Sequence, residues 1–180
     1  MVEAPATMQT RRLTLRQARD TDVDAIYEYA CDSKVTAYAV WPRVTDKRQV
    51  HDYLSKVREG WTLGTEFTWF LCEQVASPAI GAVAARVRGS TAELGFILNP
   101  RYWNRGYATE ATIEVVRWLS TLPNVNRIWA TCDTENAASS RVLEKAGLVV
   151  EGRVPGGMVR PNISLQPRGA MLYATNRTAA

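Results

Sequence analysis

The stretch from Ala92 to Glu110 constrains this chain more than any other, because it reads as a strand, a glycine-containing turn and the start of a helix. Its first part is mostly apolar, as expected of a buried strand. Asn99-Pro100 ends that strand, since proline cannot continue a hydrogen-bonded ladder. The helix that follows carries one apolar stripe and stops before Pro123. The segment therefore predicts a strand-turn-helix unit within an α/β domain.

The turn between this strand and helix, residues 104–109, contains no proline, so every peptide N–H can donate. Gly106 lets a ligand approach the backbone closely, and the helix N-terminus adds about half a positive charge. These properties predict an anion site, with phosphate as the natural ligand. A plain strand-to-helix connection is the alternative interpretation. Neither G-x-x-x-x-G-K-[ST] nor G-x-G-x-x-G occurs, so nucleotide hydrolysis and a dinucleotide fold are not indicated.

The segment W-N-R-G-Y-A-T-E-A, residues 103–111, resembles the acyl-coenzyme A loop of the GNAT N-acetyltransferase superfamily, whose pattern is Q/R-x-x-G-x-G/A. Gly106 and Ala108 fall on the two small positions of this pattern. Trp103 replaces the usual Gln or Arg. That replacement is typical of the branch resembling the Rim-type ribosomal-protein N-terminal acetyltransferases.

A second segment, residues 135–148, resembles the family's N-x-x-S motif ending in E-K-x-G-F, with Leu148 in place of Phe. The two motifs occur in the family's order. The resemblance implies a single-domain GNAT fold of the α/β (α+β) class over residues 11–176, between flexible tails at 1–10 and 177–180. Its sheet is expected to be mixed and mostly antiparallel, with about seven strands splayed between the fourth and fifth and about four helices on both faces.

Hydrophobic spacing and turn residues place the individual elements. We expect strands near 12–18, 67–73, 80–88, 92–98, 127–132, 149–153 and 169–174, and helices at 20–31, 45–61, from the 104–109 turn to 122, and 137–145. Residues 155–167 hold three prolines and paired glycines. They predict a long shaped loop, with a short strand at 158–159 as an option, that decides which acceptor is used.

The resemblance implies acetyl-coenzyme A as the cosubstrate. Backbone amides after Trp103 would hold its pyrophosphate, and the pantetheine arm would lie between the splayed strands. One strand amide would polarise the thioester carbonyl. The implied binding residues are Phe96, Ile97, Leu98, Trp103, Asn104, Arg105, Gly106, Tyr107, Ala108, Thr109, Asn136, Ser139 and Arg141.

Some of these positions have a structural alternative. Asn136 suits a helix N-cap as well as a pantetheine contact. Arg141, with Lys145 one turn further on, could reach the 3′-phosphate or could form a solvated helix face. Tyr38 and Trp41 could line an acceptor pocket, although such aromatics also fill cores.

Acetyl transfer to an amine needs a base, and Glu93 is the candidate because it lies on the strand beside the expected thioester. A surface glutamate at a sheet edge is the alternative. Ser139 and Ser140 are candidates for protonating the leaving thiolate or ordering a water, against simple solvation of a helix turn. Many relatives carry a Tyr acid where this chain has Leu143, so the acid assignment stays open.

Composition limits the alternatives. With 46% hydrophobic and 22% charged residues over 180 positions, about one globular domain is expected. The start of the chain does not read as a signal peptide, and no run is apolar enough for a membrane span. Three scattered cysteines indicate a reducing, cytoplasmic location, and with the single His51 they offer no metal site. The net charge of +4 suits coenzyme A but is too small to imply nucleic acid.

The sequence therefore predicts an N-acetyltransferase, monomeric or homodimeric, that moves acetyl directly to a primary amine on a protein N-terminus or a small molecule. A non-catalytic module that binds acyl-coenzyme A or a metabolite is the alternative. Leu143 supports that alternative, as does Gly169, where related chains often carry Asp. An RNA- or ribosome-docking protein is a third hypothesis, and no basic block interleaved with aromatics supports it.

Overall fold

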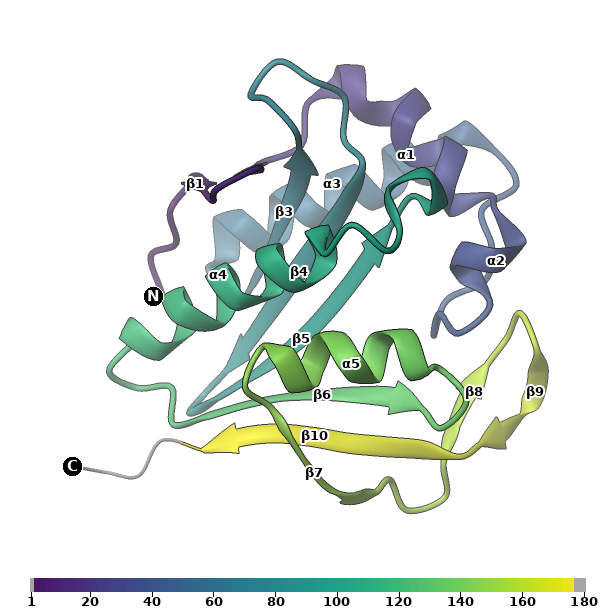
Figure 1. The fold of residues 1–180 in the computed structure, drawn as a ribbon. Coiled ribbons are helices and arrows are strands. Elements are labelled where there is room, and N and C mark those ends of the chain that lie inside the picture. Colours follow the sequence, from purple (N-terminus) through teal and green to yellow (C-terminus); the bar gives the residue numbers. More distant parts are fainter. Residues whose placement is uncertain (1, 177–180) are drawn as a thin grey trace.

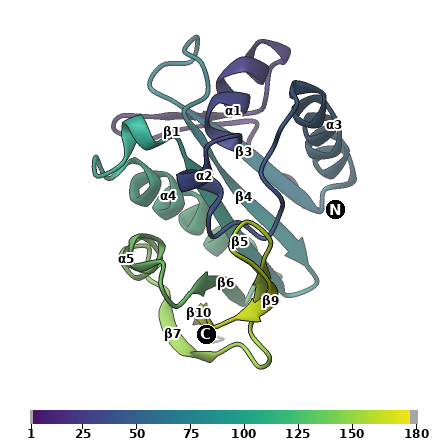
Figure 2. The same cartoon turned by 90° about the vertical axis from the view of Figure 1, so that its right-hand side faces the viewer.

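A computed structural model describes residues 2–176. Its main feature is an eight-stranded sheet in the order β1-β2-β3-β4-β5-β6-β10-β7, with a separate two-stranded sheet formed by β8 and β9. Helices α4 and α5 cover one face of the large sheet and α1 and α3 cover the other (Figures 1 and 2). The expected C-terminal tail, 177–180, lies outside the described residues.

The strands are β1 (Thr7–Gln9), β2 (Thr14–Arg16), β3 (Glu66–Cys72), β4 (Gly81–Arg88), β5 (Thr91–Leu98), β6 (Arg127–Asp133), β7 (Val149–Arg153), β8 (Met158–Arg160), β9 (Ser164–Arg168) and β10 (Ala170–Asn176). The helices are α1 (Val23–Ala30), α2 (Ser33–Thr36), α3 (Lys47–Leu63), α4 (Tyr107–Thr121) and α5 (Ala137–Lys145), with short 3-10 turns η1 (Asp20–Asp22) and η2 (Pro100–Tyr102). The expected mixed, mostly antiparallel α/β fold is confirmed.

Local sequence explains where the helices begin and end. The side chain of Asp46 accepts a hydrogen bond from the N–H of Arg48 at 2.8 Å, and the Gln49 side chain accepts from the N–H of Asp46 at 3.2 Å. This reciprocal cap starts α3 where the sequence predicted a start. Gly64, at φ 65°, ends the helix in the left-handed conformation that glycine adopts most easily.

Apolar stripes of the helices pack on both faces of the sheet. On one face Ala111, Val115 and Leu119 of α4 are fully buried. On the other face Val50 and Leu54 of α3 pack against α1, as the helical spacing predicted. The expectation that tryptophans fill core also holds for some of them, since Trp61, Trp69 and Trp118 form edge-to-face contacts with ring centroids 5.1–5.2 Å apart.

The sheet splits where β5 meets β6, its one parallel pair. Only three residue pairs join these strands, the last being Glu93 with Trp129. β5 remains paired to β4 as far as Leu98, and β6 remains paired to β10 as far as Asp133. The expected splay between the fourth and fifth predicted strands is therefore confirmed.

Three regions differ from the expectation. Thr7–Gln9, within the expected N-terminal tail, forms β1 on β2, with Met8 buried. The short helix α2 was not predicted. Residues 155–167 are largely a β-hairpin, β8–β9. The optional strand at 158–159 is present as part of β8, whereas the prediction of a long loop over the whole segment was wrong. The prolines argued against strands in this segment. Both strands of a two-stranded sheet are edge strands, however, and an edge strand tolerates a proline such as Pro167.

Candidate active site

A cavity of about 540 Å³ occupies the gap between the separated ends of β5 and β6. Its walls bring together the end of β5, β6, the second sequence motif on α5 and the segment from α1 to α3. The residues that line it include Phe96 and Ile97 from β5, Ala130–Cys132 from β6, and Asn136, Ser139 and Leu143 from α5. A volume of this size is typical of a small-molecule site.

The turn before α4 leaves its amides free. Gly106 caps the helix at φ 78°, and Asn104 also has a positive φ of 59°. The N–H groups from Arg105 to Thr109 donate no hydrogen bond to any other residue between 2 and 176, while Glu110 N–H returns to the Gly106 carbonyl at 2.9 Å. Residues 103–106 are exposed. Five successive donors at a helix N-terminus form an anion cradle.

Trp103 has a different role from its neighbours in this turn. Its indole N–H donates to the carbonyl of Leu98 at 2.8 Å, and its backbone N–H donates to Pro100 at 3.1 Å. The side chain is 40% exposed. Both donors of Trp103 are thus used within the protein, so the tryptophan positions the turn on the end of β5. Leu98 is buried and does not line the cavity, whereas Phe96 and Ile97 do.

The first turn of α4 is anchored by Glu110. Its carboxylate accepts from Thr10 Oγ1 at 2.6 Å, Arg12 N–H at 2.8 Å and Arg12 Nε at 2.7 Å. Burial raises the pKa of Glu110, but the bonds from Thr10 and Arg12 outweigh it and hold the pKa below its usual value. Tyr107 adds a bond from its hydroxyl to Glu73 at 2.8 Å. These contacts tie the anion cradle to the β1–β2 turn and to the end of β3.

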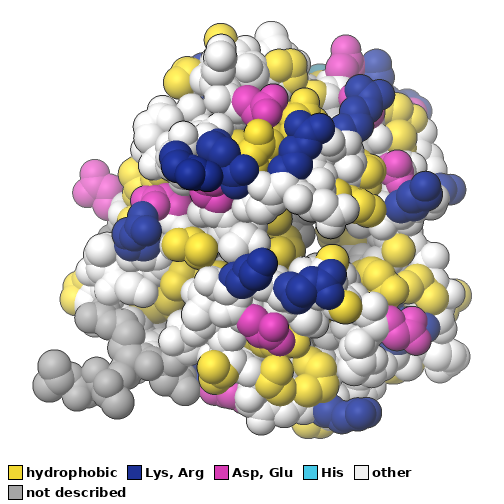
Figure 3. Space-filling view, in the orientation of Figure 1, with side chains coloured by type: hydrophobic (Ala, Val, Ile, Leu, Met, Phe, Trp, Pro, Cys, Tyr) yellow, Lys and Arg dark blue, Asp and Glu magenta, His cyan; other side chains and the backbone are white. Residues whose placement is uncertain are grey.

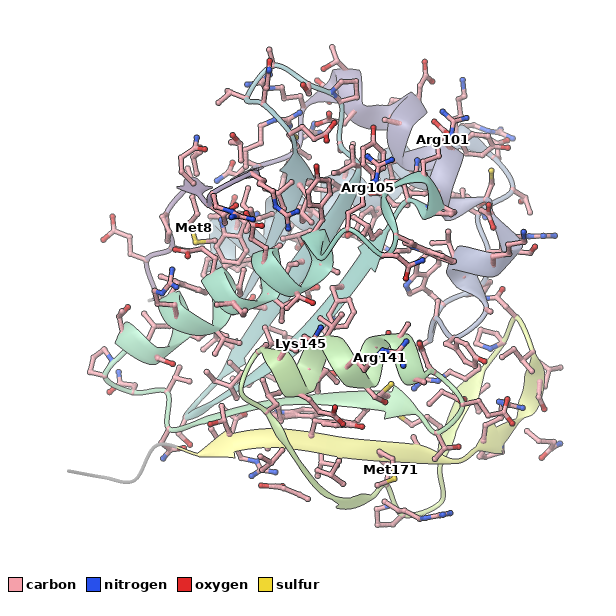
Figure 4. The ribbon with its side chains drawn as sticks, viewed as in Figure 1. Met8, Arg101, Arg105, Arg141, Lys145 and Met171 are labelled. Atoms are coloured by element: carbon pink, nitrogen blue, oxygen red, sulfur yellow. The ribbon has the colours of Figure 1, made fainter. Side chains whose placement is uncertain are left out.

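Basic side chains surround the cradle. Figure 3 shows Lys and Arg side chains gathered above and below a hollow on this face. Arg101 and Arg105 lie near the turn before α4, while Arg141 and Lys145 project from α5 (Figure 4). A second hollow of about 550 Å³ is lined by Gly106, Thr109, Arg117 and Lys145 among others. Arg141 is exposed and does not line this hollow. Lys145, one turn further along α5, does line it and is therefore better placed to meet an anion there.

Glu93 faces the cavity and not a sheet edge, because β5 lies in the middle of the large sheet. Arg86 donates to Glu93 Oε2 at 2.9 Å and to both carboxylate oxygens of Glu66 at 3.0 Å. The hydrogen bonds that Arg86 donates to Glu66 are the main cause that raises the pKa of Arg86, so this arginine stays charged. Two carboxylates therefore share one guanidinium at the point where the strands separate.

Asn136 caps α5 and also lines the cavity. Its Oδ1 accepts from Ser139 N–H at 3.1 Å, which caps α5, and the residue lines the cavity. Ser139 also lines the cavity, whereas Ser140 Oγ bonds the Asn136 carbonyl at 3.3 Å and lies 3.6 Å from Cys132 Sγ. Burial chiefly raises the pKa of the Cys132 thiol, so it is not a thiolate nucleophile at neutral pH.

The far end of the cavity is built by parts of the chain that the sequence motifs do not include. Tyr38 and Trp41 line it, and Trp41 also packs against the core between α1 and α3. Tyr29 lies deeper, and burial raises its pKa well above its ordinary value, so the phenol stays protonated. Arg160 of β8 and Asp133 of β6 also line the cavity, and sequence reasoning identified neither.

Asn162, at the β8–β9 turn, connects the parts of the chain that form this end of the cavity. Its amide nitrogen donates to the carbonyls of Thr36 at 2.7 Å and Trp41 at 2.9 Å, and its Oδ1 accepts from Arg43 N–H at 2.7 Å. The hairpin is thereby fastened to the segment between α2 and α3 (Figure 1). The sequence around Asn162 contains no pattern that predicts this contact, because its partners are more than 100 positions away.

The described residues contain neither a metal-binding group of side chains nor a membrane-spanning helix. Within 2–176 no three His, Cys, Asp or Glu side chains are grouped to hold a metal ion, and His51 lies exposed on α3. No helix in that range combines the length and hydrophobicity needed to cross a membrane.

Comparison with known proteins agrees with this geometry. The family model of the acetyltransferase (GNAT) domain matches residues 12–149. The uncharacterized N-acetyltransferase YnaD of Bacillus subtilis (strain 168) is 31% identical over 143 residues, covering 79% of this chain and 82% of YnaD. A GNAT-family acetyltransferase structure from Bacillus anthracis superposes with a TM-score of 0.81 at 25% identity, covering 94% of this chain and 98% of that one.

A second similar structure holds a ligand. RimL, a ribosomal L7/L12 alpha-N-protein acetyltransferase in complex with coenzyme A, superposes with a TM-score of 0.82 at 16% identity, covering 96% of each chain. This likeness shows a shared fold. The family model and the relative named above extend over most of the sequence, and the family model alone runs from β2 to β7. The chain therefore belongs to the GNAT acetyltransferase family.

Proposed function

We propose that this protein transfers the acetyl group of acetyl-coenzyme A directly to a primary amine. The observation that carries the proposal is the row of five free N–H groups from Arg105 to Thr109 beside the open end of the β5–β6 gap. The amides supply donors for a diphosphate. Trp103 ties their turn to Leu98 at the end of β5, and the preceding residues Phe96 and Ile97 line the cavity. RimL, of the same fold, was solved with coenzyme A.

The unpaired part of β5 is suited to the pantetheine arm. Beyond Glu93 this strand has no ladder partner on its β6 side. Ile97 pairs with Ala82 of β4 in the hydrogen-bonded register, so the backbone groups of Phe96 are the ones available to a ligand. A strand amide aimed at the thioester oxygen would stabilise the charge that develops there, an effect worth about 3–4 kcal/mol where measured. The Nδ2 of Asn136 bonds no other described residue and faces the same space.

In the reaction the amine nitrogen forms a bond to the carbonyl carbon, the C–S bond breaks, and a proton passes from the nitrogen to the sulfur. Glu93 is the proposed base, directly or through water, because its carboxylate faces the cavity where the strands part. Ser139 is the proposed group near the leaving sulfur. Ser140 is a weaker candidate, since its hydroxyl contacts Asn136 and Cys132.

The acceptor remains between a protein N-terminal amine and a small-molecule amine. RimL acts on a ribosomal protein, and its likeness to this chain concerns the fold. The cytoplasm is the proposed location, because Cys31, Cys72 and Cys132 are all free thiols.

Thermal unfolding with acetyl-coenzyme A tests the proposal. A ligand at 100 times its Kd stabilises a protein by about 2.7 kcal/mol, and we expect Gly106→Val to abolish that shift by blocking the cradle. Gly89→Val is the matched control, because Gly89 also has a positive φ (58°) but lies in the β4–β5 turn. It should lose stability to backbone strain and keep the ligand-induced shift.

Thiol release with a panel of amines then separates an enzyme from a binding module. Release that depends on the amine supports acetyl transfer. A thermal shift with acetyl-coenzyme A but no release from any amine would favour the non-catalytic alternative. No shift with the wild-type protein would remove the cradle from consideration altogether.

A further inference from the structure

Arg160 is a buried charge without a hydrogen-bonded partner. The residue is only 4% exposed, and its Nε–H has no hydrogen-bond partner anywhere in the described chain. No other side-chain hydrogen bond of Arg160 is found among residues 2–176, and its nearest carboxylate oxygen, Oδ2 of Asp133, is 3.9 Å away. This long ion pair leaves the buried Nε–H without an acceptor, which is unfavourable, so the missing hydrogen-bond partner calls for an explanation.

Asp133 does not supply that partner, because other donors use its oxygens. Arg168 Nε donates to Oδ2 at 3.1 Å, and the N–H of Glu135 donates to Oδ1 at 3.0 Å. Arg168 also bonds Glu135 at 2.6 Å. The Asp133 carboxylate is therefore satisfied by Arg168 and the backbone, and it stands near Arg160 without bonding it.

The other charged side chains that line the cavity away from Arg160 and Asp133 form a group of their own. Glu66 and Glu93 both bond Arg86, so that group carries one more negative than positive charge. It lies on β3, β4 and β5, on one side of the strand separation. Arg160 lies on the other side, with β6 and β8. The cavity thus has a side rich in carboxylate and an opposite side with an unused guanidinium.

Arg160 is held in place by the fold. Asn162, two residues later, fastens the hairpin to the α2–α3 segment through three hydrogen bonds of 2.7–2.9 Å. Tyr38 and Trp41 from that segment line the same end of the cavity. A guanidinium fixed in this way presents a planar set of donors that matches a carboxylate or phosphate.

We infer that Arg160 binds an anionic group on the acceptor, so that the substrate is a small amine that also carries a carboxylate or a phosphate. The inference rests on the proposed acetyl transfer and adds the class of acceptor. The amine of such a substrate would lie toward Glu93 and its anionic group toward Arg160. A polyamine, which carries only positive charge, would leave Arg160 without a partner.

Matched acceptor pairs test this directly. Thiol release would be measured with glycine, β-alanine and 4-aminobutyrate, each against its amide, with phosphoethanolamine against ethanolamine, and with spermidine. At least one carboxylate or phosphate amine should exceed its neutral partner about 10- to 100-fold in kcat/KM, as expected for a charge-assisted pair. Arg160→Gln should remove most of that preference and affect the neutral acceptors little.

Two variants control the measurement. Arg153→Gln makes the same substitution at an exposed position on β7 and should leave the preference intact. Arg160→Lys keeps the charge without the planar donors and should give an intermediate preference. The thermal shift with acetyl-coenzyme A, which Arg160 does not contact in this proposal, should be unchanged in all three variants and reports that they fold.

The outcomes separate this inference from the proposed function. Equal use of anionic and neutral acceptors, best turnover with spermidine, or an equal loss for all acceptors in Arg160→Gln would overturn the role of Arg160 while acetyl transfer stands. If no amine is acetylated, calorimetric titration of the same pairs in the presence of coenzyme A replaces turnover. Tighter, Arg160-dependent binding of the anionic amines would then support the inference although the proposed function fails, and equal binding would overturn it.

Discussion

Arg16 and Arg160 are equally buried, each 4% exposed, but they differ in their hydrogen bonding. Arg16 donates to both oxygens of Asp22, at 2.7 and 2.9 Å, and to the carbonyls of Gln17, Val75 and Ser77. Arg160 bonds no side chain in the described range. Burial alone therefore says nothing about the role of a charged residue. A fully bonded arginine stabilises the fold, and an unbonded one beside a cavity points to a ligand.

The largest expected effect comes from removing the partner of Arg16. Asp22→Asn keeps the shape but leaves a buried guanidinium uncompensated, which should lower the free energy of unfolding by about 3–5 kcal/mol. The melting temperature should fall by about 6–20 °C. Asp20→Asn is the control, because the Asp20 side chain is 81% exposed and its partner Arg58 is also at the surface. Similar losses in both variants would remove the contrast between buried and exposed pairs.

The same pair should respond to acid. Burial raises the pKa of Asp22, but the bonds from Arg16 and the N–H of Arg19 outweigh it and bring the pKa below 3.8. A lowered folded-state pKa means that this stabilisation is complete above about pH 3.8 and is lost as pH falls through the lower, folded value. Urea unfolding at pH 7, 5 and 3 should show the wild type approaching Asp22→Asn only at the lowest pH.

Arg86 shares one property with each of these arginines: it is hydrogen-bonded like Arg16, and it lines the cavity like Arg160. Its partner Glu93 is the proposed base. Glu93→Gln should reduce kcat about 100-fold at neutral pH, as expected for loss of a general base. The defect should shrink at high pH, where the acceptor amine, with an ordinary pKa of about 8 to 10.4, is already deprotonated. Glu66→Gln, which alters the other partner of Arg86, is the matched control. An unchanged pH–rate profile in Glu93→Gln would remove Glu93 from the mechanism.

A smaller effect is expected at the anchor of α4. Glu110→Gln weakens the bonds to Thr10 and Arg12 and should cost about 1–2 kcal/mol of stability, a fall of about 2–8 °C in melting temperature. Glu114→Gln, one turn later, loses only a pair within its own helix and should change the melting temperature less. Equal losses would show that the anchor adds nothing beyond an ordinary surface pair.

The smallest effect on stability is expected at Arg160. Because no hydrogen-bonded pair is broken and Asp133 keeps Arg168, Arg160→Gln should change the free energy of unfolding by less than about 1 kcal/mol. Denaturant titration of this variant beside Asp22→Asn measures the comparison directly. A loss near 3 kcal/mol, about the size expected for breaking a buried pair, would make Arg160 a structural residue like Arg16.

Sequence patterns predicted the elements that depend on local chemistry. Helical stripes, the Asp46 cap and the Gly106 turn each lie within a few residues, and the structure has them where they were expected. The tertiary site escaped prediction because its members are distant in sequence. Nothing near Arg160 indicates that Asp133, 27 positions earlier, is already bonded to Arg168. The hairpin was also missed, since its prolines argue against strands unless the strands are edges.

The contact between Asn162 and the α2–α3 segment provides a way to measure the opening of the cavity. The backbone amide of Arg43 donates to the Asn162 side chain, 119 residues away, so it can exchange its proton with solvent only when the hairpin tip lifts. Amide hydrogen exchange at this one position therefore measures how often the far wall of the cavity opens. Slowing of that exchange by an acceptor would locate the bound molecule without any turnover.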